Sequence, residues 1–193
     1  MAEGEAVEGA GPRGGLARLW AGWRHAYVAD IDAVAGTTTE GTVFERILAA
    51  GLDDSVCHIL WRGRAVFAIL NAYPYATGHL MVLPFRPVAQ LGDLTTDESL
   101  ELWEAVGHGV AAVEEAYSPE GMNVGMNLGA AGGAGVPDHI HVHVVPRWGG
   151  DTNFMTSVAE ARVLPEPLDE TWRRLRAAWP VPDADGAPIP SKP

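Results

Sequence analysis

Three histidines alternate with apolar residues in the C-terminal half of the chain. Residues 139–145 read His-Ile-His-Val-His-Val-Val, so that one residue separates His139 from His141 and His141 from His143. Because successive side chains of a β-strand point to opposite faces, a strand here places the three imidazoles together on one face. The apolar residues between them would face a core and hold the imidazoles on a rigid support. The pattern predicts a histidine-lined functional site.

This alternation is open to three interpretations. The first is a half-buried strand whose polar face simply meets water. The second is a metal site, but a full site needs a third or fourth ligand, and no nearby Cys or Glu pattern supplies one. The third is nucleophilic catalysis on phosphorus, because a neutral imidazole with a pKa near ~6.5 is a competent nucleophile that neighbouring histidines can orient or assist. We favour the third interpretation.

A glycine-rich loop precedes the histidines and suits a phosphate-containing substrate. Residues 129–138 read Gly-Ala-Ala-Gly-Gly-Ala-Gly-Val-Pro-Asp, and backbone N–H groups of such a loop can hold phosphate oxygens without a positive charge. The loop is not a P-loop or a dinucleotide fingerprint, because a strand rather than a helix follows it. The chain carries 25 acidic and 13 basic residues and a formal charge of -12, which argues against a broad grip on nucleic acid.

The composition also limits the class of protein. The single cysteine, Cys57, can form neither an internal disulfide nor a thiolate metal cluster. The first fifteen residues are acidic and lack the apolar stretch of a secretion signal, and no apolar run approaches the ~20 residues of a membrane helix. We expect a soluble, cytoplasmic protein without a membrane or nucleic-acid partner.

The hydrophobic periodicity predicts the elements that must position the histidines. We expect tails at 1–15 and 181–193 around a single domain at 16–180. Expected helices cover 16–30, 42–50, 95–117 and 168–179, and expected strands cover 56–61, 64–70, 79–84, 122–128 and 139–145. The order of these elements predicts an α+β fold with an antiparallel sheet of about five strands and helices packed mainly on one face.

Two separated segments resemble the histidine-triad (HIT) family of nucleotide hydrolases and transferases. They are HIHVHVV followed by PRWGGDTNFM, and NAYPYATGHLMVLPFRPV upstream of them. The likeness spans roughly residues 16–180, and the flanking segments look most similar to bacterial diadenosine tetraphosphate phosphorylases or hydrolases. The resemblance implies a HIT-like fold, a homodimer, and cleavage of dinucleoside polyphosphates without a cofactor. Hydrolysis of adenosine phosphoramidate or phosphosulfate, or nucleotide binding without useful turnover, are the alternatives.

The resemblance also implies roles for individual residues. His141 would attack the α-phosphorus to form a nucleotidyl-histidine, which water or phosphate then cleaves. His143 would contact the phosphate and help the leaving group, while His139 and His79 would orient the triad. The implied substrate-binding residues are Asn71 for the ribose, Asn127 for the phosphate chain, and the backbone amides around Ala134, Gly135, Val136 and Pro137.

The chain departs from the family pattern at the positions of a structural zinc. Many bacterial relatives carry a Cys-x-x-Cys pair where this chain has Thr42-Val43-Phe44-Glu45, and a histidine where it has Pro87. Because these ligands are missing together, we predict that no metal is bound. The loop before the triad also has Ala134 and Gly135 where a Gln, Ser or Thr is common. Arg147 and Trp148 remain without an assigned role, and a structural role is expected for His25, His58 and His108.

Overall fold

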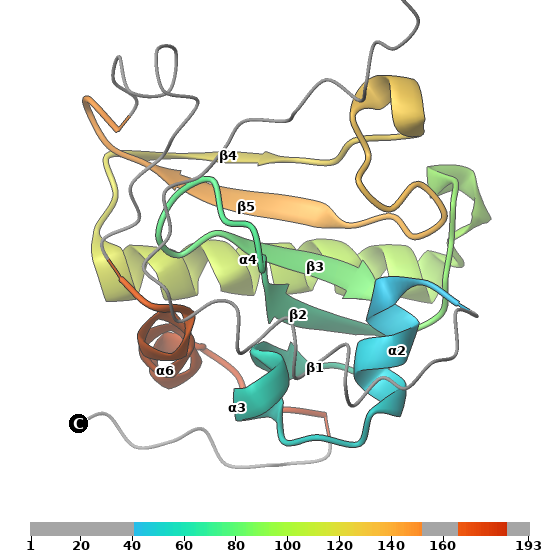
Figure 1. Ribbon diagram of the computed structural model, residues 1–193, viewed down its shortest axis with the longest axis horizontal. Helices are drawn as coiled ribbons and strands as arrows, with labels where there is room; N and C mark the ends of the chain where they lie inside the picture. Colours follow the sequence, from blue (N-terminus) through green and yellow to red (C-terminus); the bar gives the residue numbers. More distant parts are fainter. Residues whose placement is uncertain (1–40, 152–165, 185–193) are drawn as a thin grey trace, which may run out of the picture.

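A five-stranded antiparallel sheet forms the centre of the molecule (Figure 1). The computed structural model describes residues 41–151 and 166–184. Its strands are β1 (Ile59–Arg62), β2 (Val66–Leu70), β3 (Leu80–Pro84), β4 (Gly121–Gly125) and β5 (Val142–Arg147). Their order across the sheet is β1-β2-β3-β5-β4, and every neighbouring pair is antiparallel. The predicted α+β class is confirmed.

One face of the sheet packs against the two longest helices, α4 (Thr96–Tyr117) and α6 (Leu168–Ala178). On this face Val142 and Val144 of β5 join a core with Leu102 and Val113 of α4 and Leu175 of α6. Burying such aliphatic side chains contributes about 1.5–3 kcal/mol each. The predicted inward direction of Val142 and Val144 is therefore confirmed, and helices cover mainly this face.

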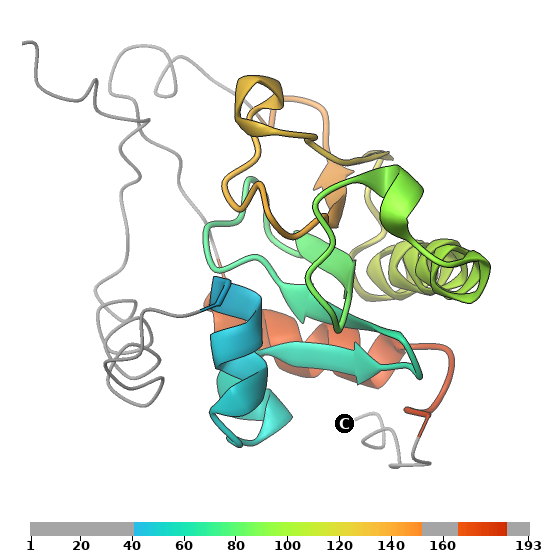
Figure 2. The ribbon, with the colours of Figure 1, turned by 90° about the vertical axis from the view of Figure 1, so that its right-hand side faces the viewer.

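The opposite face is only partly covered. The short helices α2 (Val43–Ala49) and α3 (Asp54–Cys57) lie on this side, and α2 and α4 flank the sheet in the edge-on view of Figure 2. Phe44 and Ile47 of α2 pack with Phe67 and Met81 of the sheet in a second core. The remaining part of this face, over β5 and β4, is where the histidines lie.

Thr42 and Thr95 begin their helices with the same local structure. Each hydroxyl accepts a hydrogen bond from the N–H three residues later, and the glutamate at that position accepts from the threonine N–H in return. Such a capping box satisfies two of the N–H groups that a helix start leaves without partners. It fixes the start of α4 at the predicted place, and it anchors α2 beside the histidines.

Several predicted boundaries shift. The strand predicted at 139–145 begins only at Val142, because the N–H of Ile140 donates to the Val88 carbonyl, at 2.7 Å, outside the β3 ladder. The strand predicted from Val56 begins at Ile59, since α3 takes the preceding residues. The strand predicted at 122–128 spans Gly121–Gly125.

The long helix α4 turns most of its large apolar side chains toward the sheet, but not Trp103. Trp103 is 49% exposed, whereas Val106 and Val113 are buried. Glu101 of the same helix accepts from the backbone N–H groups of Arg64 and Ala65. It thereby holds the turn between β1 and β2.

Ordered contacts continue past the predicted domain end at residue 180. The Asp183 carboxylate is buried, pairs with Arg176 of α6, and accepts from the Arg62 N–H of β1. The N–H of Ala184 also donates to the Arg62 carbonyl, at 2.8 Å. The predicted tail at 1–15, the predicted helix at 16–30 and residues 185–193 lie outside the described residues. Among the helices that the structure describes, none is long and apolar enough to cross a membrane.

Candidate active site

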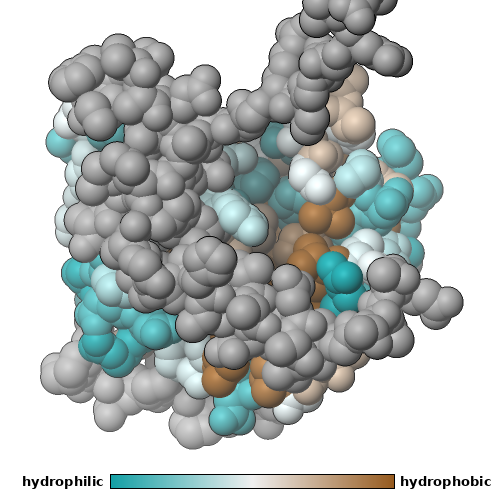
Figure 3. Space-filling view, in the orientation of Figure 1, coloured by the Kyte–Doolittle hydropathy of each residue, from teal (hydrophilic) through white to brown (hydrophobic). Residues whose placement is uncertain are grey.

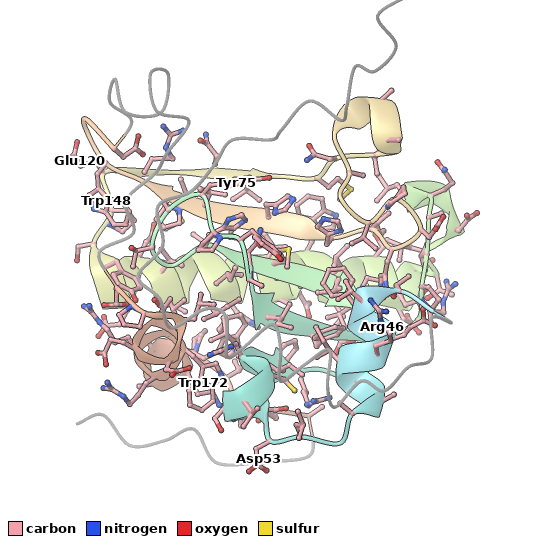
Figure 4. The ribbon with its side chains drawn as sticks, viewed as in Figure 1. Arg46, Asp53, Tyr75, Glu120, Trp148 and Trp172 are labelled. Atoms are coloured by element: carbon pink, nitrogen blue, oxygen red, sulfur yellow. The ribbon has the colours of Figure 1, made fainter. Side chains whose placement is uncertain are left out.

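The histidines gather on the sheet face that points away from α4. The ring centroids of His141 and His143 are 4.9 Å apart, and those of His79 and His143 are 5.1 Å apart. His143 lies on β5, His141 directly precedes that strand, and His79 directly precedes β3. The antiparallel pairing of β3 with β5 therefore brings His79, remote in sequence, to the triad. Figure 4 shows this face with its side chains.

His141 has a defined tautomer. Its Nδ1 lies 2.8 Å from the carbonyl oxygen of His139, and because a carbonyl can only accept, Nδ1 carries the proton. The lone pair then lies on Nε2, which is the form that a nucleophile needs. The residue is only 6% exposed and contacts the ring of Phe44 at 5.6 Å, so its ring is held in place.

A chain of hydrogen bonds fixes the tautomer of His143. The Tyr75 N–H donates to His79 Nδ1, at 3.0 Å, so that the His79 proton lies on Nε2. His79 Nε2 in turn lies 2.9 Å from His143 Nδ1 and donates to it. The His143 proton is therefore on Nε2, where it can donate to a substrate oxygen. Burial first, and then repulsion by His141, lower the pKa of His143 to about 4, so the ring is neutral at pH 7.

His139 is fully buried, and both of its ring nitrogens contact protein atoms. Its Nε2 donates to the Pro84 carbonyl at 2.8 Å, so its Nδ1 accepts from the Thr42 hydroxyl at 3.1 Å. Burial lowers the pKa of His139 as well. Its ring is thus a fixed support, and its backbone carbonyl is the group that orients His141. The sequence places Thr42 at the start of an expected helix and at one position of the missing zinc ligands, but it does not predict this contact.

The predicted substrate-binding residues differ in the contacts that they make. Asn71, which directly follows β2, has its side-chain nitrogen 3.4 Å from His79 Nε2, and its side-chain oxygen accepts from the Tyr73 N–H at 2.8 Å. The Ala134 N–H already donates to the Gly129 carbonyl at 3.2 Å, and Pro137 has no N–H. Of the four predicted loop residues, Gly135 and Val136 therefore remain the better candidates for amide contacts to phosphate.

A cavity of about 500 Å³ lies beside His143. Of the predicted site residues only His143 and Asn127 line it, together with residues that the sequence analysis did not assign: Tyr75, Ala76, Asn123, Val124, Gly125, Val145, Arg147 and Asp151. Tyr75 lies in front of β4 and β5 in Figure 4. The space-filling view of this face has apolar residues at the surface next to hydrophilic ones (Figure 3). The alternation of Asn123, Gly125 and Asn127 with apolar residues is the sequence pattern that could have indicated this side of the cavity.

Arg147 is held at the far end of this cavity. Its Nε donates to the Asp151 carboxylate at 2.5 Å, and its Nη1 donates to the Asn123 side-chain oxygen at 2.7 Å. The hydrogen bond that this guanidinium donates to Asp151 is the main cause that raises its pKa. The paired charges leave this end of the cavity close to neutral.

The residues at the zinc positions of many bacterial relatives do not suit zinc. Thr42 and Glu45 bind each other in the capping box of α2, and Thr42 also contacts His139. Pro87 offers no side-chain donor atom for a metal. Within residues 41–151 and 166–184, no three His, Cys, Asp or Glu side chains are grouped to hold a metal ion.

Comparison with known proteins agrees with this geometry. The family model described as HIT domain matches residues 54–150. The chain is 40% identical over 172 residues to a protein named AP-4-A phosphorylase from Mycobacterium tuberculosis, which covers 89% of this chain and 88% of that protein. It therefore belongs to the HIT domain family, as the two sequence motifs predicted.

Two further similarities cover less of the chain. A bis(5'-nucleosyl)-tetraphosphatase [asymmetrical] from Schizosaccharomyces pombe is 35% identical over 89 residues, or 46% of this chain and 48% of that protein. The crystal structure of a zinc-bound histidine triad family protein from Mycobacterium smegmatis superposes with a TM-score of 0.59 at 28% identity. The superposition covers 72% of this chain and 93% of that one.

Proposed function

We propose that this protein cleaves dinucleoside polyphosphates, such as diadenosine tetraphosphate, through a nucleotide covalently bound to His141. The observation that carries the proposal is the pair of defined tautomers, with a lone pair on His141 Nε2 beside a proton on His143 Nε2. The names of the relatives support the substrate class, because both act on dinucleoside polyphosphates by name.

In the first step His141 Nε2 attacks the α-phosphorus. A P–N bond forms, the P–O bond to the departing polyphosphate breaks, and its electron pair stays on the leaving oxygen. The His139 carbonyl, which accepts from His141 Nδ1, stabilises the positive charge that develops on the ring. His143 Nε2 donates a hydrogen bond to a phosphate oxygen as negative charge moves toward the leaving group.

In the second step an oxygen of water or inorganic phosphate attacks the same phosphorus. A P–O bond forms, the P–N bond breaks and its electron pair returns to Nε2, so that His141 regains its starting tautomer. When water is the acceptor, it releases one proton to solvent. Asn127 supports the phosphate chain, Asn71 contacts the ribose, and the amides of Gly135 and Val136 hold phosphate oxygens. Hydrolysis and phosphorolysis differ only in this acceptor.

Product analysis with diadenosine tetraphosphate, with and without inorganic phosphate, tests the function. ADP plus ATP identifies phosphorolysis, and AMP plus ATP identifies hydrolysis. His141→Asn should abolish turnover, whereas Glu104→Gln, a control at an exposed position of α4, should leave it within about twofold, as expected for a surface change away from the site. Undiminished turnover by His141→Asn would contradict the proposal.

We further propose a cytoplasmic homodimer. β4 is an edge strand whose residues are mostly exposed, Val124 among them, and such an edge is a ready surface for a second copy. The buried single cysteine, Cys57, suits a reducing compartment. A monomer in light scattering at micromolar concentration would contradict the dimer.

A further inference from the structure

We propose that the cavity beside His143 binds the departing nucleotide, the half of the substrate that leaves as a nucleoside polyphosphate. This inference rests on the proposed function and adds a second subsite to it. The cavity contains neither Asn71 nor the loop residues 134–137, and of the predicted substrate-binding residues it contains only Asn127, so it extends beyond the predicted contacts of the nucleotide that is transferred to His141.

The position of the cavity follows from the register of the two last strands. His143, Val145 and Arg147 alternate along β5 and share the histidine face, and His143 and Val145 lie opposite Gly125 and Asn123 of β4. At about 3.3 Å per residue, the path from His143 to Arg147 is about 13 Å long. That length suits a phosphate chain that begins at the reaction centre and continues into a nucleoside.

Gly125 keeps the near end of this path open. It lies directly opposite His143, and a Cβ built on it would meet no atom within 4 Å. A side chain at this position would instead occupy the cavity, since directly opposite Cβ atoms of a strand pair lie only about 5 Å apart. The absence of a side chain therefore leaves room for phosphate beside the His143 proton.

The walls offer the contacts that a nucleotide needs. Tyr75, 40% exposed, lies with its ring centroid 6.0 Å from that of His143, and an aromatic face of this kind can stack on a base. Asn127, two residues beyond Gly125 on the side away from Arg147, contributes an amide at the near end of the path. At the far end the Arg147–Asp151 pair and Asn123 provide donors and acceptors with little net charge, which suits the uncharged nucleoside better than further phosphate.

Two glycine variants test the assignment. Gly125→Val fills the near end, while Gly107→Val is the control, because Gly107 is equally open, is exposed on α4, and does not line the cavity. Each is assayed with diadenosine tetraphosphate and with adenosine phosphoramidate, whose leaving group is small. Gly125→Val should lower the ratio of kcat/KM for diadenosine tetraphosphate to kcat/KM for adenosine phosphoramidate about tenfold or more, a typical penalty for a steric misfit in a binding pocket, and Gly107→Val should leave the ratio unchanged.

A binding measurement makes the result independent of turnover. Calorimetric titration with ATP, the departing product, should give a weaker affinity for Gly125→Val than for Gly107→Val, and Asn123→Ala should weaken it also. Equal ATP affinities and equal ratios across the variants would overturn the subsite. Absence of turnover on both substrates by the unaltered protein would instead contradict the proposed function, and the titrations would still decide the subsite.

Discussion

At the scale of single residues, the fold keeps His139 and His143 neutral. Burial is the main cause that lowers the pKa of each, and it lowers the pKa of His58 as well. Neutral rings at these two positions place no positive charge beside the Nε2 lone pair on which the proposed attack depends. Burying these neutral rings lowers the free energy of unfolding at acid pH, because the unfolded chain then binds more protons than the folded chain.

This cost gives a prediction about stability against pH. The folded pKa of His143 is about 4 and its unfolded value is 6.5, so between these values the unfolded state binds more protons and the free energy of unfolding falls as the pH falls. His143→Asn should make that fall shallower between pH 6.5 and 4. Denaturant titrations at several pH values measure it, and an unchanged slope would contradict the buried, neutral state of His143.

Glu98 changes the free energy of unfolding in a lower pH range, so it does not obscure the effect of His143. The hydrogen bond from Arg86 is the main cause that lowers its pKa from 4.5 to about 2. Its stabilising contribution is therefore complete above pH 4.5 and is lost as the pH falls toward 2.

At the scale of elements, the start of α2 supports the catalytic residues. Thr42 caps this helix and also donates to His139, whose carbonyl orients His141. Thr42→Val keeps the shape but removes both hydrogen bonds, and loss of the cap alone should cost about 1 kcal/mol of stability. We expect kcat to fall with little change in KM.

Thr42→Ser is the control for that prediction, because it retains the hydroxyl. Serine should recover most of kcat and of the free energy of unfolding, measured by steady-state kinetics and denaturant titration. If valine and serine gave equal kcat values, the contact between Thr42 and His139 would have no part in positioning His141.

The helices and strands also show how much of the structure could be predicted from the sequence. Local periodicity and capping chemistry were enough to predict the alternation of His141 and His143 with valines, the threonine cap of α4, and the apolar strands β2 and β3. The start of β5 was not, since it depends on Ile140 bonding to Val88, a contact between distant segments. The cavity was missed for the same reason, because it arises only when β4, β5 and the Tyr75 loop come together.

At the scale of the whole molecule, a buried ion pair joins the C-terminal segment to the sheet. Arg176 and Asp183 are 7% and 5% exposed, and their charged groups approach to 2.5 Å. Arg176 also donates to the Leu60 carbonyl, and Asp183 accepts from the Arg62 N–H. Both members of the ion pair therefore bind the backbone of β1. Composition suggested a tail from residue 181, but no local pattern could reveal this distant pairing.

Removing one partner should destabilise the protein strongly. Asp183→Ala leaves a buried guanidinium without its carboxylate, which typically costs about 3–5 kcal/mol. Glu104→Ala, at an exposed position of α4, should change the free energy of unfolding by less than about 0.5 kcal/mol. Similar losses for the two variants in denaturant titration would show that the ion pair does not hold the C-terminal segment.

The central claim is that the nucleotide passes through a covalent bond to His141 Nε2. Its direct measurement is mass spectrometry of the protein stopped during turnover of diadenosine tetraphosphate in alkaline denaturant, where a P–N bond survives better than in acid. We expect an added adenylyl group that peptide mapping places on His141 and that is absent from His141→Asn. Turnover without any adduct, or an adduct on another residue, would contradict the account.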